Sequence, residues 1–318
     1  MSPWPWVDTH ADSLGDVLAG RRHLDAASGS GQWDFVRMRA AGQRIAFLSC
    51  WVEPVHKPAG ALARLLAYVD AAHAELERDP SLTLVRDGAS LTAAWAEPAG
   101  GVVLSVEGAE ALGTDPAILR ILWRLGVRVL ALTWNERNLL ADGAGEDPGG
   151  GGLSRAGRRV VAEMNRLGMV VDVSHLAEAG FWDVLALSTR PPLASHSNCR
   201  ALAPHPRNLS DAQIRALARA GGVQSVTFVK DFLGGTRDRA AVVGHILHHL
   251  DVVGDDRHVA LGSDFDGVTE AVPGLEDPGR VPDLFEDLAR AGLGEATLRR
   301  LAGENVVALL RAHWEAGS

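Results

Sequence analysis

The chain has 318 residues, of which 47% are hydrophobic and 22% charged, a balance typical of a globular protein and not of a disordered one. Its net charge is −9, and this acidic balance disfavours a nucleic-acid partner, which usually needs a basic surface. The apolar runs are shorter than the ~18–20 residues that a membrane span requires. We therefore expect no nucleic-acid partner and no membrane partner.

The chain ends and the cysteines bear on location. The first residues, Met-Ser-Pro-Trp-Pro-Trp, lack the basic and then apolar pattern of a secretory signal, and no hydrophobic tail for a lipid anchor follows the last predicted helix. The two cysteines, Cys50 and Cys199, are too few for a disulfide framework, so we expect both to be small buried residues. These features predict a cytoplasmic protein.

Short apolar runs that end in polar residues recur along the chain and predict strands buried on both faces. They lie at residues 6–7, 44–52, 102–106, 127–132, 169–173, 192–194, 222–229 and 259–261. Helical spacing of apolar residues predicts helices at 59–77, 154–167, 211–220, 239–250 and 295–313, with Ser210 as an N-cap.

About eight strand–helix rounds at this length predict an α/β fold, a parallel (β/α)8 TIM barrel that forms a single domain over residues 1–318. A doubly wound sheet is the alternative, but no Gly-x-Gly-x-x-Gly follows the first strand. One glycine-rich stretch, residues 142–152, predicts a mobile loop, and we favour an ordinary excursion over a lid.

Polar residues that could bind a metal or take part in catalysis follow the strand ends, which converge on one face of a barrel. They are His10, Asp12, Glu107, His175, His196 and Asp264. His10 and Asp12 are two apart and point to the same side of a strand, where they could hold one divalent metal. His175 and His196 end successive strands and could hold a second metal.

Glu107 lies between these two pairs around the ring, and its two oxygens could bridge two cations, which predicts a two-metal site. Asp264 remains free to take a proton from a metal-activated water, with a further ligand or a turn residue as the alternative. The neighbouring Asp266, before Gly267, is interpreted as a turn residue. Arg207 could clamp a substrate carboxylate, although its position alone favours a solvated loop arginine.

The ordered set of segments resembles the membrane (renal) dipeptidase family, zinc dipeptidases of the amidohydrolase type. The matching segments are Asp8-Thr9-His10-Ala11-Asp12, Val106-Glu107-Gly108, Met164-Asn165-Arg166-Leu167-Gly168-Met169, Asp172-Val173-Ser174-His175, Ser195-His196-Ser197, Pro206-Arg207-Asn208, Gly262-Ser263-Asp264-Phe265-Asp266-Gly267, Pro273-Gly274-Leu275-Glu276-Asp277 and Gly303-Glu304-Asn305.

The resemblance implies a (β/α)8 fold with two zinc ions as cofactor. It implies that His10 and Asp12 bind one zinc, that His175 and His196 bind the other, and that Glu107 bridges them. The same resemblance makes Asp264 the proton shuttle and Arg207 the partner of the substrate's terminal carboxylate. A homodimer is also a family expectation.

One position departs from the family pattern. Trp134 stands where family dipeptidases usually carry a His after the fourth strand, and an indole cannot shuttle a proton near neutral pH. We interpret Trp134 as a substrate-binding residue, with barrel packing as the alternative.

The sequence therefore predicts a zinc-dependent hydrolase. Its substrate would be a small molecule, a dipeptide or an N-acyl amino acid, and a hydroxide held between the two metals would attack the amide. A D-residue at the carboxyl-terminal position is compatible with this prediction. The alternatives are an amidohydrolase or lactonase with another substrate, and a metal-free binding protein on the same fold.

Overall fold

The architecture is a closed parallel barrel, seen in a computed structural model that describes residues 4–314. Within these residues, the ring consists of β1 (Trp6–Ala11), β2 (Gln43–Trp51), β4 (Gly101–Glu107), β5 (Val127–Ala131), β6 (Val170–Asp172), β7 (Leu193–Ala194), β8 (Val223–Val226) and β9 (Val259–Leu261). Parallel pairing of β2 with β4 and of β1 with β9 closes the ring. The predicted (β/α)8 fold is confirmed.

A further strand, β3 (Thr83–Leu84), was not predicted. It pairs with the first two residues of β4, Gly101 and Val102. The edge of β4 that it occupies is taken over by β5 from Leu104 onward. β3 therefore extends one edge at the amino-terminal end of the barrel and leaves the ring itself unchanged.

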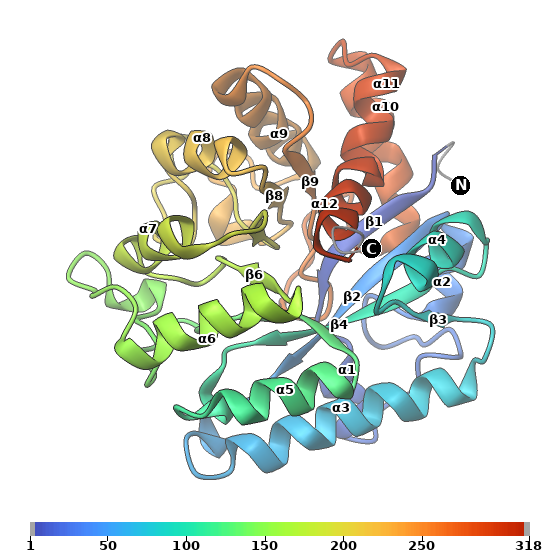
Figure 1. The fold of residues 1–318 in the computed structure, drawn as a ribbon. Helices are drawn as coiled ribbons and strands as arrows, with labels where there is room; N and C mark the ends of the chain where they lie inside the picture. The colour runs from blue at the N-terminus through green and yellow to red at the C-terminus, as the bar shows by residue number, and fades with distance from the viewer. Residues whose placement is uncertain (1–3, 315–318) are drawn as a thin grey trace.

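Helices surround the strands (Figure 1). They are α1 (Leu14–Leu18), α2 (Phe35–Ala40), α3 (Ala61–Arg78), α4 (Gly88–Ala96), α5 (Pro116–Arg124), α6 (Arg155–Leu167), α7 (Glu178–Leu187), α8 (Asp211–Arg219), α9 (Arg239–Val253), α10 (Val281–Arg290), α11 (Glu295–Arg299) and α12 (Asn305–Trp314). Ser210 caps α8 as predicted, because its side chain accepts a hydrogen bond from the backbone N–H of Gln213. The helix predicted at 295–313 is continuous but contains a π-helical turn at Arg300–Glu304 between α11 and α12.

The core has two apolar layers. Ile45 and Phe47 alternate with outward residues along β2 and share a face with Ser49, whose hydroxyl meets Glu107 inside the barrel. The same inner cluster includes Val306 and Leu310 of α12, and Figure 1 shows α12 near the centre of the ring of helices. α12 thus closes the apolar end of the barrel, and polar side chains occupy the other end.

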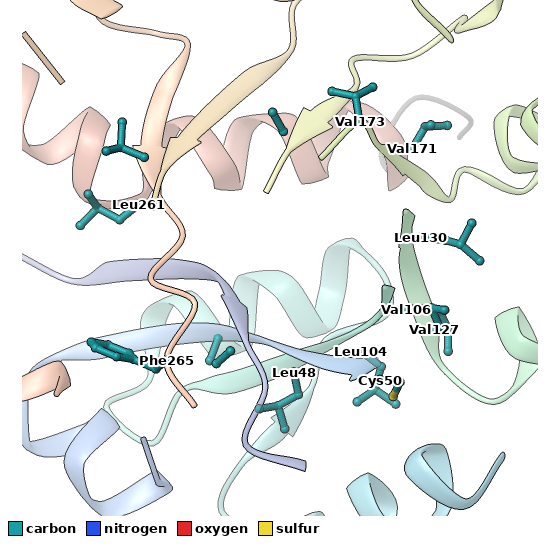
Figure 2. Close-up of a cluster of buried hydrophobic side chains, with 14 of the residues drawn as sticks. Leu48, Cys50, Leu104, Val106, Val127, Leu130, Val171, Val173, Leu261 and Phe265 are labelled. Carbon is teal, nitrogen blue, oxygen red and sulfur yellow. The ribbon is translucent and has the colours of Figure 1, made fainter. Parts of the chain in front are cut away.

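The outer layer fills the space between strands and helices. Figure 2 shows Leu48 and Cys50 of β2 beside Leu104 and Val106 of β4 in this layer. Cys50 and Cys199 are both free and buried, as predicted, and burial raises the pKa of each thiol to about 12.

The described residues include no helix with the length and apolar character needed to cross a bilayer. Residues 1–3 and 315–318, which carry part of the expectations of no leader and no anchor, lie outside the described residues.

Phe47→Ala tests the inner layer. Phe47 is fully buried, so we expect the substitution to lower the free energy of unfolding by about 3–5 kcal/mol. Val55→Ala is the control, because Val55 is 85% exposed and its change should stay within about 0.5 kcal/mol. Urea unfolding measures both, and equal losses would contradict the assignment of Phe47 to the core.

Candidate active site

The residues predicted at the strand ends do meet at one mouth of the barrel. His10 Nε2 lies 3.3 Å from Asp12 Oδ2, 3.5 Å from Glu107 Oε2 and 3.8 Å from Asp264 Oδ1. His10 is 2% exposed and Glu107 is 6% exposed. The first half of the cluster thus brings together one imidazole and three carboxylates. Two of these carboxylates, Asp12 and Asp264, are far apart in the sequence.

The second half of the cluster lies on the other oxygen of Glu107. Glu107 Oε1 is 2.7 Å from His175 Nε2 and 3.6 Å from His196 Nε2. The two Nε2 atoms are 2.8 Å apart. Glu107 therefore presents one oxygen to His10 and the other to His175 and His196, an arrangement that suits a bridging carboxylate.

Two of these side chains come from strained backbone. His175 has φ = 68° and Asp264 has φ = 63°, a left-handed conformation that costs roughly 1–2 kcal/mol for a residue with a Cβ. The turn after β6 and the turn after β9 use this conformation at the points where these side chains enter the cluster. Such strain persists only where the surrounding structure enforces it, and it concentrates at functional sites.

Neighbouring side chains orient the imidazoles. His175 donates its Nδ1–H to the side-chain oxygen of Asn135 at 2.9 Å. His196 Nδ1 lies 2.7 Å from Ser195 Oγ, and the Ser195 hydroxyl in turn donates to the Asp172 carboxylate. With each Nδ1 used as a donor, the lone pairs of both Nε2 atoms point into the cluster, as in metal-binding histidines.

This donor set fits a metal. Asp12 Oδ1 is buried and has no hydrogen-bond partner among the described residues, although a buried polar atom is normally satisfied. His10, Glu107 and His196 form one group whose ligand atoms lie within 4.8 Å of one another, and His10, Asp12 and Asp264 form a second. Imidazole nitrogens with carboxylate oxygens are ligands that suit zinc.

The electrostatics agree with this interpretation. Burial, with the charge of Arg207 adding to it, lowers the pKa of His175 to about 3, and burial with the charge of His10 holds the pKa of His196 well below its ordinary value. Burial alone would raise the pKa of Glu107, but the charges and hydrogen bonds of His10 and His175 together outweigh it and hold that pKa well below the usual range. Neutral His175 and His196 and an ionised Glu107 are the forms that bind a metal. Burial alone would lower the pKa of His10, but the charges and hydrogen bonds of Asp12 and Glu107 raise it well above its ordinary value, so a metal at His10 would displace a proton.

Asp264 behaves differently from Glu107. Burial, together with the negative charges of Asp12 and Glu107, raises the pKa of Asp264 well above its ordinary value, against the opposing charge of His10. A carboxylate with a raised pKa takes up a proton more readily than an ordinary one, which suits a group that accepts a proton during a reaction.

Arg207 is not the solvated loop arginine that its position favoured. It is 4% exposed, and its Nη2 donates to the backbone oxygen of His196 at 3.2 Å. Its Nε is buried without a hydrogen-bond partner among the described residues, and burial lowers its pKa to about 10. A buried guanidinium with an unused donor, beside the cluster, is suited to an anionic substrate group.

A cavity of about 580 Å³ lies over the cluster. Its lining includes Arg207, Trp134, Glu107, His175 and Asp264. The predicted substrate-binding residues, Arg207 and Trp134, therefore reach the same space as the cluster. The volume is within the range of pockets that enclose a small molecule.

Asp266 has a larger role than the predicted turn. The turn exists, because the N–H of Gly267 donates to the Asp264 carbonyl at 3.1 Å. The Asp266 carboxylate, however, also accepts hydrogen bonds from buried Arg22 at 2.6 Å and from the Ser13 hydroxyl. A Cβ on Gly267 would lie 2.2 Å from Asp264 Oδ1 and 2.3 Å from Asp12 Oδ2, so only glycine fits beneath these carboxylates.

The glycine-rich segment predicted to be a mobile excursion is tied to the site instead. The backbone N–H of Ala144 donates to the carbonyl of His175 at 2.7 Å, and the N–H of Gly145 donates to the carbonyl of Asn135 at 2.8 Å. A Cβ on Gly143 would lie 2.2 Å from the Trp134 carbonyl. The glycines permit this close approach of backbone to backbone, which the sequence could not distinguish from flexibility.

Comparison with known proteins places the chain. Residues 1–316 match the family described as membrane dipeptidase, peptidase family M19. The chain belongs to this family. Dipeptidase verJ of Clonostachys rogersoniana is 35% identical over 254 residues, which are 78% of this chain and 65% of verJ. Dipeptidase tcpJ of Claviceps purpurea is 38% identical over 213 residues, 66% of this chain and 50% of tcpJ. The chain thus spans half to two thirds of these curated relatives.

Solved structures of M19 enzymes match over nearly the whole chain. The dipeptidase AC, a metallopeptidase of this family, superposes with a TM-score of 0.92 at 31% identity, over 98% of this chain and 99% of that one. A metallopeptidase from Rhodobacter sphaeroides, solved with a phosphinate mimic of the dipeptide L-Ala-D-Ala, gives 0.91 at 31% identity and the same coverage. Membership in a family of metallopeptidases implies a metal cofactor, which agrees with the chemistry of the cluster.

Ser195 and its partner Asp172 were missed as functional residues, because a serine beside a histidine carries no distinctive signal. We expect Ser195→Ala to weaken zinc affinity about 10- to 100-fold, since the His196 ring loses the group that fixes its orientation. Titration calorimetry with zinc measures the affinity. Exposed Ser81→Ala is the control, and unchanged affinity in Ser195→Ala would contradict the orienting role.

Proposed function

We propose that the protein hydrolyses the peptide bond of dipeptides with two bound zinc ions. The observation that carries this proposal is the position of Glu107, which has one oxygen toward His10 and the other toward His175, in a cavity that a buried arginine also lines. The dipeptidases among the relatives, and the phosphinate mimic held by the Rhodobacter sphaeroides enzyme, support a dipeptide as substrate.

The ligands divide between the two ions. His10 and Asp12 would hold one zinc, His175 and His196 would hold the other, and Glu107 would contact both. When bound, the pair would supply an attacking hydroxide at neutral pH and polarise the peptide carbonyl. The hydrogen bonds that His175 and His196 donate to Asn135 and Ser195 would keep the two rings turned toward the ions.

The remaining residues bind substrate and move a proton. Arg207 would bind the free carboxylate of the dipeptide, which restricts substrates to short molecules with an acid at that end. Asp264 would take the proton of the attacking water and deliver it to the leaving amine. A D-residue at the carboxyl-terminal position is part of the proposal, and the L-Ala-D-Ala mimic bound by the relative supports it.

Asp264→Asn tests the proton transfer. An amide cannot accept the proton, so we expect kcat to fall by about a hundredfold or more, with zinc content unchanged. Steady-state kinetics and metal analysis measure the two quantities. Asp231→Asn on an exposed 3-10 turn is the control, since the Asp231 side chain is 75% exposed. Near-native kcat in Asp264→Asn would remove the shuttle role.

Arg207→Met tests carboxylate recognition. Methionine keeps a long unbranched side chain without the charge, so we expect kcat/KM for a free dipeptide to fall roughly 10- to 100-fold, the size of hydrogen bonds to a charged group. The same dipeptide with an amidated carboxyl end lacks the charge and should lose less. An equal loss for both substrates would contradict this assignment.

Trp134, in place of a histidine, is the feature that favours a second candidate, an amidohydrolase or lactonase with another substrate. A panel of L,L and L,D dipeptides, N-acyl amino acids and simple lactones separates the two. Turnover confined to lactones would favour the second candidate. If protein purified in the presence of zinc contains no metal, the metal-free binding protein is favoured. The cytoplasmic location and the homodimer stay predictions.

A further inference from the structure

The rings of His175, Trp134 and Trp51 lie next to one another beside the cluster. The ring of His175 is 6.2 Å from the ring of Trp134, centroid to centroid, and Trp134 is 5.2 Å from Trp51. Both tryptophans line the cavity and both are partly exposed. One wall of the cavity next to the reaction centre is therefore aromatic.

Lys57 contacts Trp134, one of the two tryptophans of this wall. The ammonium of Lys57 lies 5.3 Å from the centroid of the Trp134 ring, a favourable cation–π arrangement. Lys57 is itself fixed by Glu110, whose carboxylate is 3.1 Å from the Lys57 nitrogen. Because Trp134 does not have to be ordered when a ligand arrives, stacking on it costs little conformational entropy.

Trp51 stands across the barrel from Arg207, whereas Trp134, in the loop after β5, lies between them around the ring. Trp51 ends β2, and Arg207 lies in the loop after β7. Around the ring, β4, β5 and β6 separate these two strands on one side, and β1, β9 and β8 separate them on the other. A dipeptide whose carboxylate binds Arg207 would cross the cluster and place its amino-terminal residue against the tryptophans.

Charged groups near this wall are already paired. Arg64 donates to Glu53, with Nε at 2.9 Å from Oε2, and the Tyr68 hydroxyl donates to Glu53 at 3.2 Å. Arg21 pairs with Asp16. These side chains line the same cavity but offer no unpaired charge to a substrate side chain. The wall thus favours an apolar or aromatic group over a charged one.

We propose that Trp51 and Trp134 form a subsite for an aromatic side chain on the amino-terminal residue of the substrate. This inference rests on the proposed dipeptidase function and names the substrate class within it. Aromatic rings stack or meet edge to face at centroid distances of 4.5–7 Å, and two tilted indoles beside the open cavity present faces and edges for such contacts. The cavity of about 580 Å³ leaves room for a ring in addition to the dipeptide backbone.

The test compares L-Phe-D-Ala, L-Ala-D-Ala and L-Glu-D-Ala with the zinc-loaded enzyme. We expect kcat/KM for L-Phe-D-Ala to exceed that for L-Ala-D-Ala about tenfold, the size of a stacked aromatic contact, and L-Glu-D-Ala to be no better than L-Ala-D-Ala. Trp51→Ala should reduce the ratio of kcat/KM for L-Phe-D-Ala to that for L-Ala-D-Ala to about one, because one of the two indoles of the subsite is missing. Trp182→Ala is the matched control, since Trp182 is 39% exposed on α7 away from the cavity, and it should keep the ratio.

A binding measurement separates the subsite from the chemistry. Calorimetry with phosphinate mimics of L-Phe-D-Ala and L-Ala-D-Ala should give tighter binding of the first in the native enzyme and equal binding in Trp51→Ala. If Trp51→Ala does not fold, Trp51→Phe, which retains a smaller ring, should lower the ratio without abolishing it. If none of the dipeptides is hydrolysed, the proposed function fails, and the phosphinate affinities still decide the subsite. Equal affinities for the two mimics, or a preference for L-Glu-D-Ala, would overturn it.

Discussion

The structure depends on the concentration of ionisable groups around Glu107 at the carboxyl end of the barrel. Three imidazoles and three carboxylates lie there within contact of one another and are nearly excluded from water. Burying so many charges is unfavourable unless they are paired, hydrogen-bonded or coordinated to a metal. The Asp12 oxygen has no hydrogen-bond partner among the described residues, and the lone pairs of His175 and His196 point inward. A cation bound among these groups would satisfy them.

Contacts outside the cluster hold its side chains in position. Strand pairing fixes where each ligand enters, and the left-handed turns at His175 and Asp264 aim two of the side chains inward at a conformational cost. The turn at Asp264 is held from outside by Asp266, whose carboxylate binds the buried guanidinium of Arg22. The turn at His175 is held by the backbone of Ala144. At the opposite end of the barrel, apolar side chains of α12 pack against the strands and keep them in place.

Much of this could be predicted from the sequence because it is encoded locally. A buried strand followed by a polar residue identifies both the element and the residue that it presents, which is how His10, Glu107 and His196 were found. β3 was missed because two residues carry no periodicity. The burial of Arg207 and the anchoring of Asp266 depend on contacts between distant segments, since Arg22 is 244 positions from Asp266. The single-domain boundary at 1–318 stays a prediction.

Trp134 stands where the family pattern has a histidine, and the side chains around Glu107 still gather in one cluster beside it. An indole donates one hydrogen bond and carries no proton that it can exchange at neutral pH, so in the proposed reaction proton transfer would fall to Asp264, whose pKa is raised. The position then contributes surface instead of acid–base chemistry. Its ring packs beside Trp51, and the Lys57 ammonium lies over the same ring. The proposed subsite and the proposed reaction would therefore use different side chains of one cavity.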